Sequence, residues 1–384
     1  MLDCKKQLFD LSDEYSFLNC AYLSPQLKSV TAAGQHALVQ KAMPYGILPE
    51  HFFRHHKGVK SAFADIINAA EPERIALLPS ASYGISTAAL NAPVQEGQEI
   101  IILQDQFPSN YYPWSRLAKE KGATIKMVGV AEGKDKGLRW NQAILEAINP
   151  KTAVVAIAHV HWAEGLLFDL AAIRKKSKEV GAWLIIDGTQ SVGALDFDVQ
   201  KIQPDALICA SYKWLMAPYG TAVAYYGPAF DNGKPIEENW INRKDSQNFR
   251  NLVNYQEAYQ PLAGRYSVGQ QSNFVLMPML ETALQQIRAW EPKNIQAYCQ
   301  HLNEPYLEEL QTLGFSIAPK DQRPNHLLGL GFPKGIDPDQ LQKELAKNKI
   351  LVSIRGASIR VAPNVYNEAW DWERLMRVLR KAGV

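Results

Sequence analysis

Seven short apolar runs alternate with amphipathic segments of helical length between residues 74 and 227. The runs are RIALL (74–78), EIIIL (99–103), TIKMV (124–128), AVVAIA (153–158), AWLIID (182–187), DALICA (205–210) and TAVAYYG (221–227). Most are apolar on both faces, as in strands covered by helices on both sides. The pattern predicts an α/β fold with a mostly parallel sheet sandwiched by helices. Right-handed crossovers would bring the carboxyl end of every strand to one edge.

The rest of the chain is less regular. Residues 228–270 are polar and poorly periodic, and we expect an irregular connection there. A long helix is expected over about 276–301, bent or broken at Pro292. From about residue 313, strand-like runs mix with helical segments at about 337–348 and 369–382. These features predict a large α/β domain over 16–260 and a smaller α+β domain formed by 1–15 and 261–384.

Composition narrows the class of partner. The 41 basic residues nearly balance the 39 acidic ones, so no overall field favours nucleic acid or an anionic membrane. The four cysteines lie far apart without a CxxC pair, which disfavours a disulfide framework or a zinc cluster. No apolar run approaches the roughly 18 residues of a membrane span, and the first residues lack a secretory core. We expect a cytoplasmic protein with a small-molecule partner.

Two of the apolar runs end near a charged residue. Asp187 closes one run, and Lys213 follows another directly after Ser211 and Tyr212. Both positions fall at the sheet edge where open α/β folds bind ligands. Since burying either charge alone is costly, the two side chains either pair with each other or hold a ligand.

Pyridoxal 5'-phosphate is a ligand that needs both groups. Its aldehyde forms a Schiff base with a lysine, and its ring nitrogen stays protonated when a carboxylate lies against it. Gln190, in the turn after Asp187, could donate to the phenolic oxygen of the ring. The hydroxyls of Ser211 and Tyr212 lie at the expected height of the phosphate.

Two further segments fit this cofactor. LLPSASYGISTAAL (77–90) predicts a strand, a turn and then a helix opening through Gly84, whose first N–H groups would suit a phosphate. Taken alone, the turn favours an ordinary serine N-cap. In DQFPSNYYPW (105–114), Phe107 stands where a ring could stack on a planar cofactor, although aromatic residues at such positions are more often core.

The segments IIDGTQSVG and SYKWL resemble the cofactor-binding signature of fold-type I pyridoxal-phosphate enzymes of the class V aminotransferase group, which includes kynureninases and cysteine desulfurases. The resemblance covers nearly the whole chain in order. It implies that Lys213 forms the Schiff base, Asp187 holds the ring nitrogen and Gln190 binds the ring oxygen. It also implies an amino acid substrate and a homodimer with shared active sites.

The resemblance assigns roles to further residues. The cofactor phosphate would be bound by Ala81, Ser82, Ser211 and Tyr212, and the ring would be covered by Phe107. The substrate carboxylate would be bound by Arg360, and the substrate side chain would lie near Trp240. The phosphate of the partner's cofactor would be reached by Gln270 and Asn273. The planar fork of an arginine suits a carboxylate.

The sequence departs from both subfamilies. Kynureninases usually have histidine at the position of Gln190. Desulfurases need a nucleophilic cysteine shortly before the substrate arginine, and VSIRGAS (352–358) has none. Cys209 belongs to a buried strand and cannot substitute for it, so desulfuration is disfavoured.

Two other motifs are weaker. HVH (159–161) puts two imidazoles on one strand face, yet no third ligand has suitable spacing, so no metal site is predicted. His161 and Trp162 are expected to line the substrate side of the pocket instead. GLGFPKG (329–335) does not match GxGxxG, which removes the main support for a nicotinamide enzyme.

These observations predict a pyridoxal-phosphate enzyme acting on an amino acid. Among its possible reactions, amino-group transfer is favoured because it needs no further residues. A kynureninase-like cleavage is the alternative and would need a water-handling base and an aromatic clamp, such as Trp240 or Tyr111. Epimerisation comes third. A non-catalytic relative of the fold is disfavoured because Asp187, Lys213 and the turn at Ser82 occur together.

Overall fold

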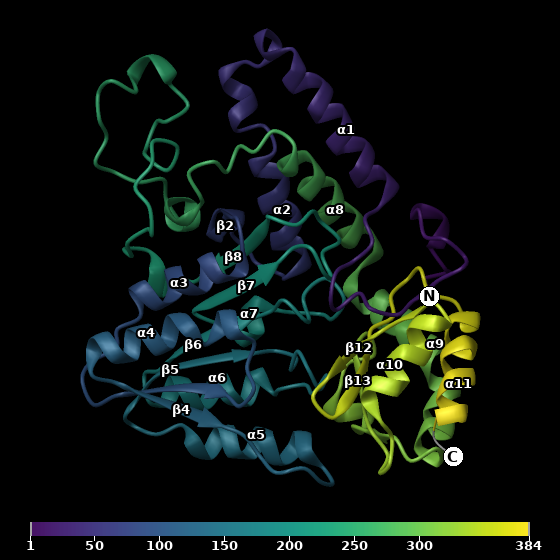
Figure 1. Ribbon diagram of the computed structural model, residues 1–384. Helices are drawn as coiled ribbons and strands as arrows, with labels where there is room; N and C mark the ends of the chain where they lie inside the picture. Colours follow the sequence, from purple (N-terminus) through teal and green to yellow (C-terminus); the bar gives the residue numbers. More distant parts are fainter. Residues whose placement is uncertain (1, 383–384) are drawn as a thin grey trace.

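The computed structural model describes residues 2–382, and a seven-stranded sheet lies at its centre (Figure 1). The strands are β2 (Ile75–Leu78), β3 (Glu99–Leu103), β4 (Thr124–Val128), β5 (Thr152–Ala158), β6 (Trp183–Asp187), β7 (Ala206–Ala210) and β8 (Ala222–Tyr226). Their order in the sheet is β2-β8-β7-β6-β5-β3-β4. All seven predicted strands are confirmed, as is the mostly parallel sheet.

Strand β8 is the exception to the parallel arrangement. It runs antiparallel to both of its neighbours, β7 and β2. The expectation that every strand ends at the same edge was therefore wrong for β8. Only residues 211–221 join β7 to β8, whereas a parallel crossover needs a dozen residues or more and usually a helix. The start of β8 consequently lies beside the end of β7, where Ala210 pairs with Ala222.

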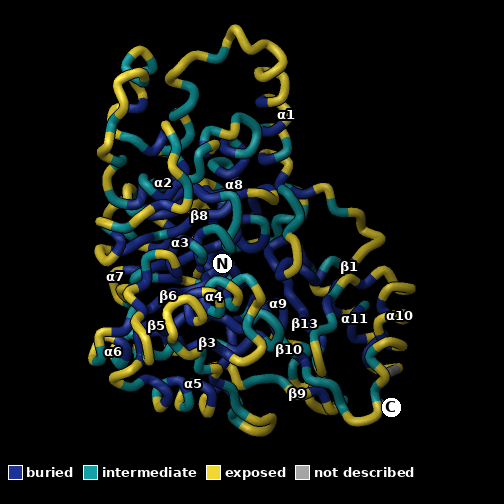
Figure 2. The backbone as a smooth tube through the Cα atoms, turned by 60° about the vertical axis from the view of Figure 1, so that its left-hand side comes forward, coloured by how far each residue is buried: buried dark blue, intermediate teal, exposed yellow. Residues whose placement is uncertain are grey.

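Helices cover both faces of this sheet, which explains why its strands are apolar throughout. Successive residues of β2 point to opposite sides: Ala76 and Leu78 belong to one apolar core, and Ile75 and Leu77 to the other. Figure 2 shows the strands as the buried centre of the molecule. The first core includes α3 (Ala81–Asn91) and α4 (Tyr112–Lys121); the second includes α2 (His56–Ile66), α5 (Lys136–Ala147), α6 (Leu170–Glu179) and α7 (Val199–Ile202).

Local sequence signals set the helix ends. The Asp169 side chain accepts a hydrogen bond from the Ala172 N–H at the start of α6, and Gly122 ends α4 in a left-handed conformation with φ of 66°. The predicted long helix is divided into α8 (Leu276–Trp290) and α9 (Pro292–Thr312). Pro292 begins the second helix, as expected, but α9 continues beyond residue 301.

A second, smaller sheet lies in the C-terminal part of the chain (Figure 1). Its antiparallel strands occur in the order β12 (Ser353–Arg355), β13 (Ser358–Val361), β10 (Leu328–Gly331) and β9 (Ser316–Ile317). Helices α10 (Pro338–Lys347) and α11 (Ala369–Ala382) accompany it. Strand β1 (Ser16–Phe17) pairs in parallel with β11 (Ile350–Leu351), so an N-terminal segment joins the C-terminal part of the chain here.

The segment 228–270 is irregular, as predicted, and contains only short 3-10 turns. After it, α8 packs against α2 and against α1 (Lys28–Ala42). The proposed domain boundary at residue 260 stays a prediction. Among the described helices, none combines the length and apolarity needed to cross a bilayer.

Candidate active site

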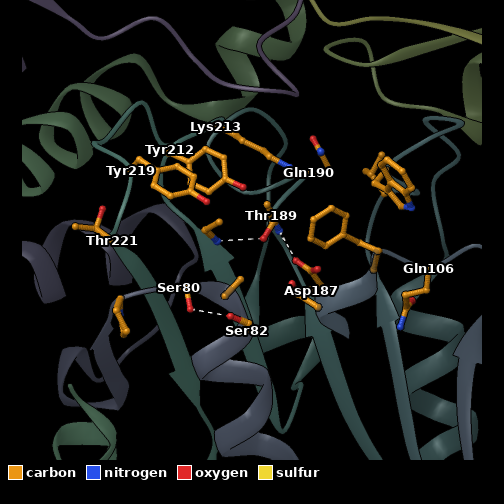
Figure 3. Close-up of a pocket in the computed structure, with 18 of the residues that line it drawn as sticks. Ser80, Ser82, Gln106, Asp187, Thr189, Gln190, Tyr212, Lys213, Tyr219 and Thr221 are labelled. Carbon is orange, nitrogen blue, oxygen red and sulfur yellow. Dashed lines mark hydrogen bonds between the residues drawn. The ribbon is translucent and has the colours of Figure 1, made fainter. Parts of the chain in front are cut away.

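A pocket opens at the edge of the central sheet where β2, β3, β5, β6 and β7 end (Figure 3). Its walls come from the loops that follow those strands and from the residues that precede β8. The lining residues are Pro79, Ser80, Ala81, Ser82, Gln106, Phe107, Ser109, Ala158, Val160, His161, Trp162, Asp187, Thr189, Gln190, Ala210, Tyr212, Lys213, Tyr219, Gly220 and Thr221.

Asp187 and Lys213 both line this pocket, and their exposed fractions are only 8% and 7%. Within the described chain no ion pair joins them, and the Lys213 Nζ makes no hydrogen bond. The Asp187 Oδ1 instead accepts a 3.0 Å hydrogen bond from the Thr189 N–H, and the Thr189 hydroxyl oxygen accepts one from the Ala210 N–H. Simple mutual pairing therefore does not account for these two buried charges.

The amine of Lys213 is poised to lose its proton near neutral pH. Its pKa is lowered from 10.5 to about 8, chiefly by burial and next by the charge of Arg360, while the Asp187 carboxylate acts in the opposite direction. Burial also raises the pKa of Asp187. A lysine with a lowered pKa is more often neutral than a solvated lysine, and only the neutral amine acts as a nucleophile or accepts a proton.

The start of α3 forms one end of the pocket. The Ser80 side chain caps the helix by accepting a 3.2 Å hydrogen bond from the Tyr83 N–H, and its Oγ lies 2.8 Å from the Ser82 Oγ. A Cβ at Gly84 would stand 2.8 Å from the Leu78 Cδ1, so glycine allows the helix to lie close to the sheet. The serine cap and the phosphate-binding turn are thus compatible, because Ala81 and Ser82 also face the pocket.

Aromatic rings surround the amine. The Lys213 Nζ lies 5.5 Å from the centre of the Phe107 ring and 5.6 Å from that of Tyr212. Phe107 contacts Trp162 edge to face at 5.6 Å, and Tyr212 packs on Tyr219 at 4.6 Å. The space next to the amine is therefore shaped for a planar group.

Gln190 is held in one orientation by the fold. Its side-chain N–H donates to the Ala21 carbonyl at 3.1 Å, and its Oε1 accepts from the Trp214 indole at 2.9 Å. The His326 Nε2 lies 2.8 Å from the Gln190 carbonyl oxygen. One amide hydrogen of Gln190 thus remains for a ligand in the pocket.

Several predicted residues are not among the lining residues of the pocket, and Ser211 and Trp240 are the first of them. The buried Ser211 hydroxyl donates to the Thr221 carbonyl, and Thr221 itself lines the pocket instead. Trp240 packs edge to face against Phe52 at 6.0 Å and Phe249 at 5.4 Å. These contacts leave the roles expected of Ser211 and Trp240 without support within one chain.

Gln270 and Asn273 are exposed and also lie outside the pocket. The Asn273 Oδ1 accepts hydrogen bonds from the N–H groups of Val275 and Leu276, at the start of α8. Their proposed contact with a partner's cofactor stays a prediction.

The two predicted substrate residues near Trp162 are both buried. His161 lines the pocket, and neither of its ring nitrogens has a partner in the described structure. Burial lowers its pKa, which favours the neutral imidazole. Arg360, 2% exposed, lies behind the pocket wall, where its Nη1 donates to the Trp162 carbonyl at 2.7 Å. Its Nε is buried without a partner.

Sequence reasoning missed several lining residues. Thr189 lies between two predicted residues, Asp187 and Gln190, so its place in the turn after β6 could have identified it. Tyr219, Gly220 and Thr221 were missed because β8 was expected to begin at the opposite edge. The short connection after β7 could have revealed them.

The donor set fits pyridoxal phosphate. A buried amine without a partner, a buried carboxylate with one oxygen bound, a flanking ring and the opening turn of a helix face one pocket. These residues are Lys213, Asp187, Phe107 and Ser82. Each offers the group that one part of the cofactor requires.

Comparison with known proteins agrees with this geometry. A model of the family aminotransferase class-V matches residues 47–378. A probable cysteine desulfurase of Pyrococcus abyssi is 33% identical, over 44% of this chain and 42% of that protein. An uncharacterized aminotransferase of Schizosaccharomyces pombe is 22% identical, over 97% of this chain and 93% of that protein. Among solved structures, the cysteine desulfurase of Thermococcus onnurineus superposes with a TM-score of 0.84 at 18% identity, covering 99% of this chain and 98% of that one.

Proposed function

The chain belongs to the aminotransferase class-V family of pyridoxal-phosphate enzymes, and on that premise we propose that it transfers the amino group of an amino acid. The observation that carries the proposal is the buried Lys213 amine, which has no hydrogen-bond or ion-pair partner among residues 2–382 and lines the same pocket as the buried Asp187 carboxylate. Neither charge is satisfied by the protein alone. Both buried charges are explained by a ligand that binds the lysine at one end and the carboxylate at the other.

When bound, pyridoxal phosphate supplies an electron sink that stabilises negative charge at the α-carbon of an amino acid. Lys213 would hold its carbonyl carbon, Asp187 its ring nitrogen, Phe107 one face of its ring and Ser82 its phosphate. Lys213 also moves the α-proton of the substrate, and its pKa of about 8 suits that task because an acid–base group works best near the ambient pH.

Amino transfer needs no residue beyond this set, which favours it over the alternatives. A kynureninase-like cleavage would need an aromatic clamp. Trp240 packs among phenylalanines, and Tyr111 packs against the α3 and α4 side of the core. Neither lines the pocket. This cleavage and epimerisation remain the second and third candidates.

Cysteine desulfuration is disfavoured although several relatives bear that name. Cys20, Cys209 and Cys299 are buried, and burial raises the pKa of each thiol, to about 11 for Cys20. A protonated, buried thiol is a poor nucleophile. The hairpin before Arg360, residues 352–358, has no cysteine.

We further propose a homodimer with shared sites, in which the exposed Gln270 and Asn273 reach the partner's cofactor phosphate. Sedimentation equilibrium of the wild-type protein tests the dimer, and a monomer at micromolar concentration would contradict it. Asn273→Ala should bind the cofactor more weakly than the wild type, and this difference should appear only in the dimer. A cytoplasmic location also stays a prediction.

Borohydride reduction and an amino acid panel test the function. The purified protein should be yellow, and reduction should fix a pyridoxyl mass on the peptide that contains Lys213 and on no other peptide. Under amino transfer at least one amino acid of the panel should be converted to its keto acid when a second keto acid is supplied, as alanine is to pyruvate, whereas kynurenine should give anthranilate under the cleavage reaction. A colourless protein that gains no pyridoxyl mass would contradict the proposal and favour a non-catalytic relative of the fold.

A further inference from the structure

Two arginines of the β12–β13 hairpin flank Trp162, a residue of the pocket wall. Arg360 donates from Nη1 to the Trp162 carbonyl at 2.7 Å. The guanidinium of Arg355 lies over the Trp162 indole, 5.8 Å from its ring centre. The hairpin comes from the small sheet, and Trp162 comes from the loop after β5, so the two sheets meet at this indole.

Neither arginine is neutralised by an acid. Among the ion pairs of residues 2–382, none involves Arg355 or Arg360. The one hydrogen bond donated by Arg355 goes from Nη1 to the adjacent Ile354 carbonyl. Glu164, the acidic residue close to Trp162 in sequence, is paired with Lys136 at 2.6 Å. Both guanidinium groups therefore keep donors for another partner.

The charges around the pocket are unbalanced as a result. Lys213 lines the pocket, and the charges of Arg360 and Arg355 both lower its pKa, which places the two guanidinium groups within electrostatic range of the amine. Asp187 is the one carboxylate among the lining residues. A substrate with a single carboxylate would bring one negative charge to two guanidinium groups and would leave one of them without a counter-charge.

We propose that Arg355 binds a second carboxylate of the substrate, so that this enzyme acts on amino dicarboxylic acids and the matching keto diacids. The inference rests on the proposed function and names the substrate class for the same site. Its position over the Trp162 indole holds the guanidinium beside the pocket wall, and Arg355 is partly exposed and so open to a ligand. If Arg355 served only as a solvated surface residue of the hairpin, the enzyme would bind a diacid and its monoamide with equal affinity.

Binding of unreactive diacids tests the inference apart from catalysis. Isothermal titration calorimetry would compare succinate with succinamate and glutarate with glutaramate, two pairs that differ in one charge but little in shape. The proteins are the wild-type holoenzyme, Arg355→Gln, Arg355→Lys and the control Arg377→Gln. Arg377 is an exposed arginine of α11, outside the hairpin and the pocket lining.

The wild type should bind the better diacid about 10- to 100-fold more tightly than its monoamide, the range expected for one charge-assisted contact. Arg355→Gln should abolish that preference, Arg355→Lys should keep part of it, and Arg377→Gln should retain it. The same order should hold for kcat/KM of aspartate against asparagine or glutamate against glutamine. Equal affinities in the wild type, or an unchanged preference in Arg355→Gln, would overturn the inference. A diacid preference without any amino transfer would refute the proposed function and support the binding site.

Discussion

Replacing Lys213 by methionine should stabilise the protein in its cofactor-free form at neutral pH. The fold lowers the pKa of Lys213 from 10.5 to about 8, chiefly through burial. At roughly 1.4 kcal/mol per pH unit, keeping this amine protonated in the fold costs about 3 kcal/mol at pH 7. Methionine has a similar length and no charge to bury. Because Asp187 loses a nearby positive charge in the variant, the net gain should be about 1–3 kcal/mol.

The pH dependence identifies the cause. The pKa of Lys213 is lower in the fold than in the unfolded chain, so the unfolded chain binds more protons between about pH 8 and 10.5. The stability of the wild type must then rise with pH in this window. Between pH 7 and 9.5 the wild type should recover roughly 2 kcal/mol, and the advantage of the variant should shrink by that amount.

Urea unfolding of both cofactor-free proteins at pH 7 and pH 9.5, followed by tryptophan fluorescence, measures these differences. Lys119→Met is the matched control, since Lys119 is exposed on α4, and it should change stability little at either pH. A Lys213→Met protein that is no more stable than the wild type at pH 7 would refute the reasoning. So would an advantage that stays constant as the pH rises.

Three further substitutions test the framework of the site. Gly193→Ala should lower the free energy of unfolding by at least about 2 kcal/mol in urea titrations, because φ is 101° there and the new Cβ would stand 2.6 Å from the Trp214 carbonyl oxygen. Ser80→Ala should lower it by about 1 kcal/mol through loss of the cap on the Tyr83 N–H, and should weaken cofactor binding measured by absorbance titration. Asp187→Asn should lower kcat/KM by at least about 100-fold, yet leave stability at pH 7 unchanged or higher, since burial disfavours the carboxylate. A fully active Asp187→Asn enzyme would contradict the role given to that carboxylate.

The residues that the sequence placed near strand ends do lie together in the structure. Asp187 ends strand β6 and Lys213 follows β7, and parallel neighbours bring such ends together without further information. Ser82 and Phe107 follow β2 and β3 in the same way. All four line the pocket, because the apolar runs had already fixed the strands.

Residues that depend on long-range packing were harder to predict. Ser211 is adjacent to Tyr212 in sequence, yet its hydroxyl turns toward Thr221, because β8 returns antiparallel to β7. Trp240 belongs to an irregular segment without periodicity, and its aromatic partners come from residues near 50 and 250. No local pattern encodes such contacts.

The sequence by itself determined the layered α/β fold and the placement of a lysine and an aspartate at one sheet edge, because apolar runs and their ends are local properties. Only the tertiary structure decided which charges remain unneutralised there. Lys213 owes its lowered pKa to burial and to Arg360, a residue 147 positions later in the chain (360 − 213). Burial and electrostatic fields depend on distance in space, and the chain brings those groups together only when the two sheets pack at Trp162.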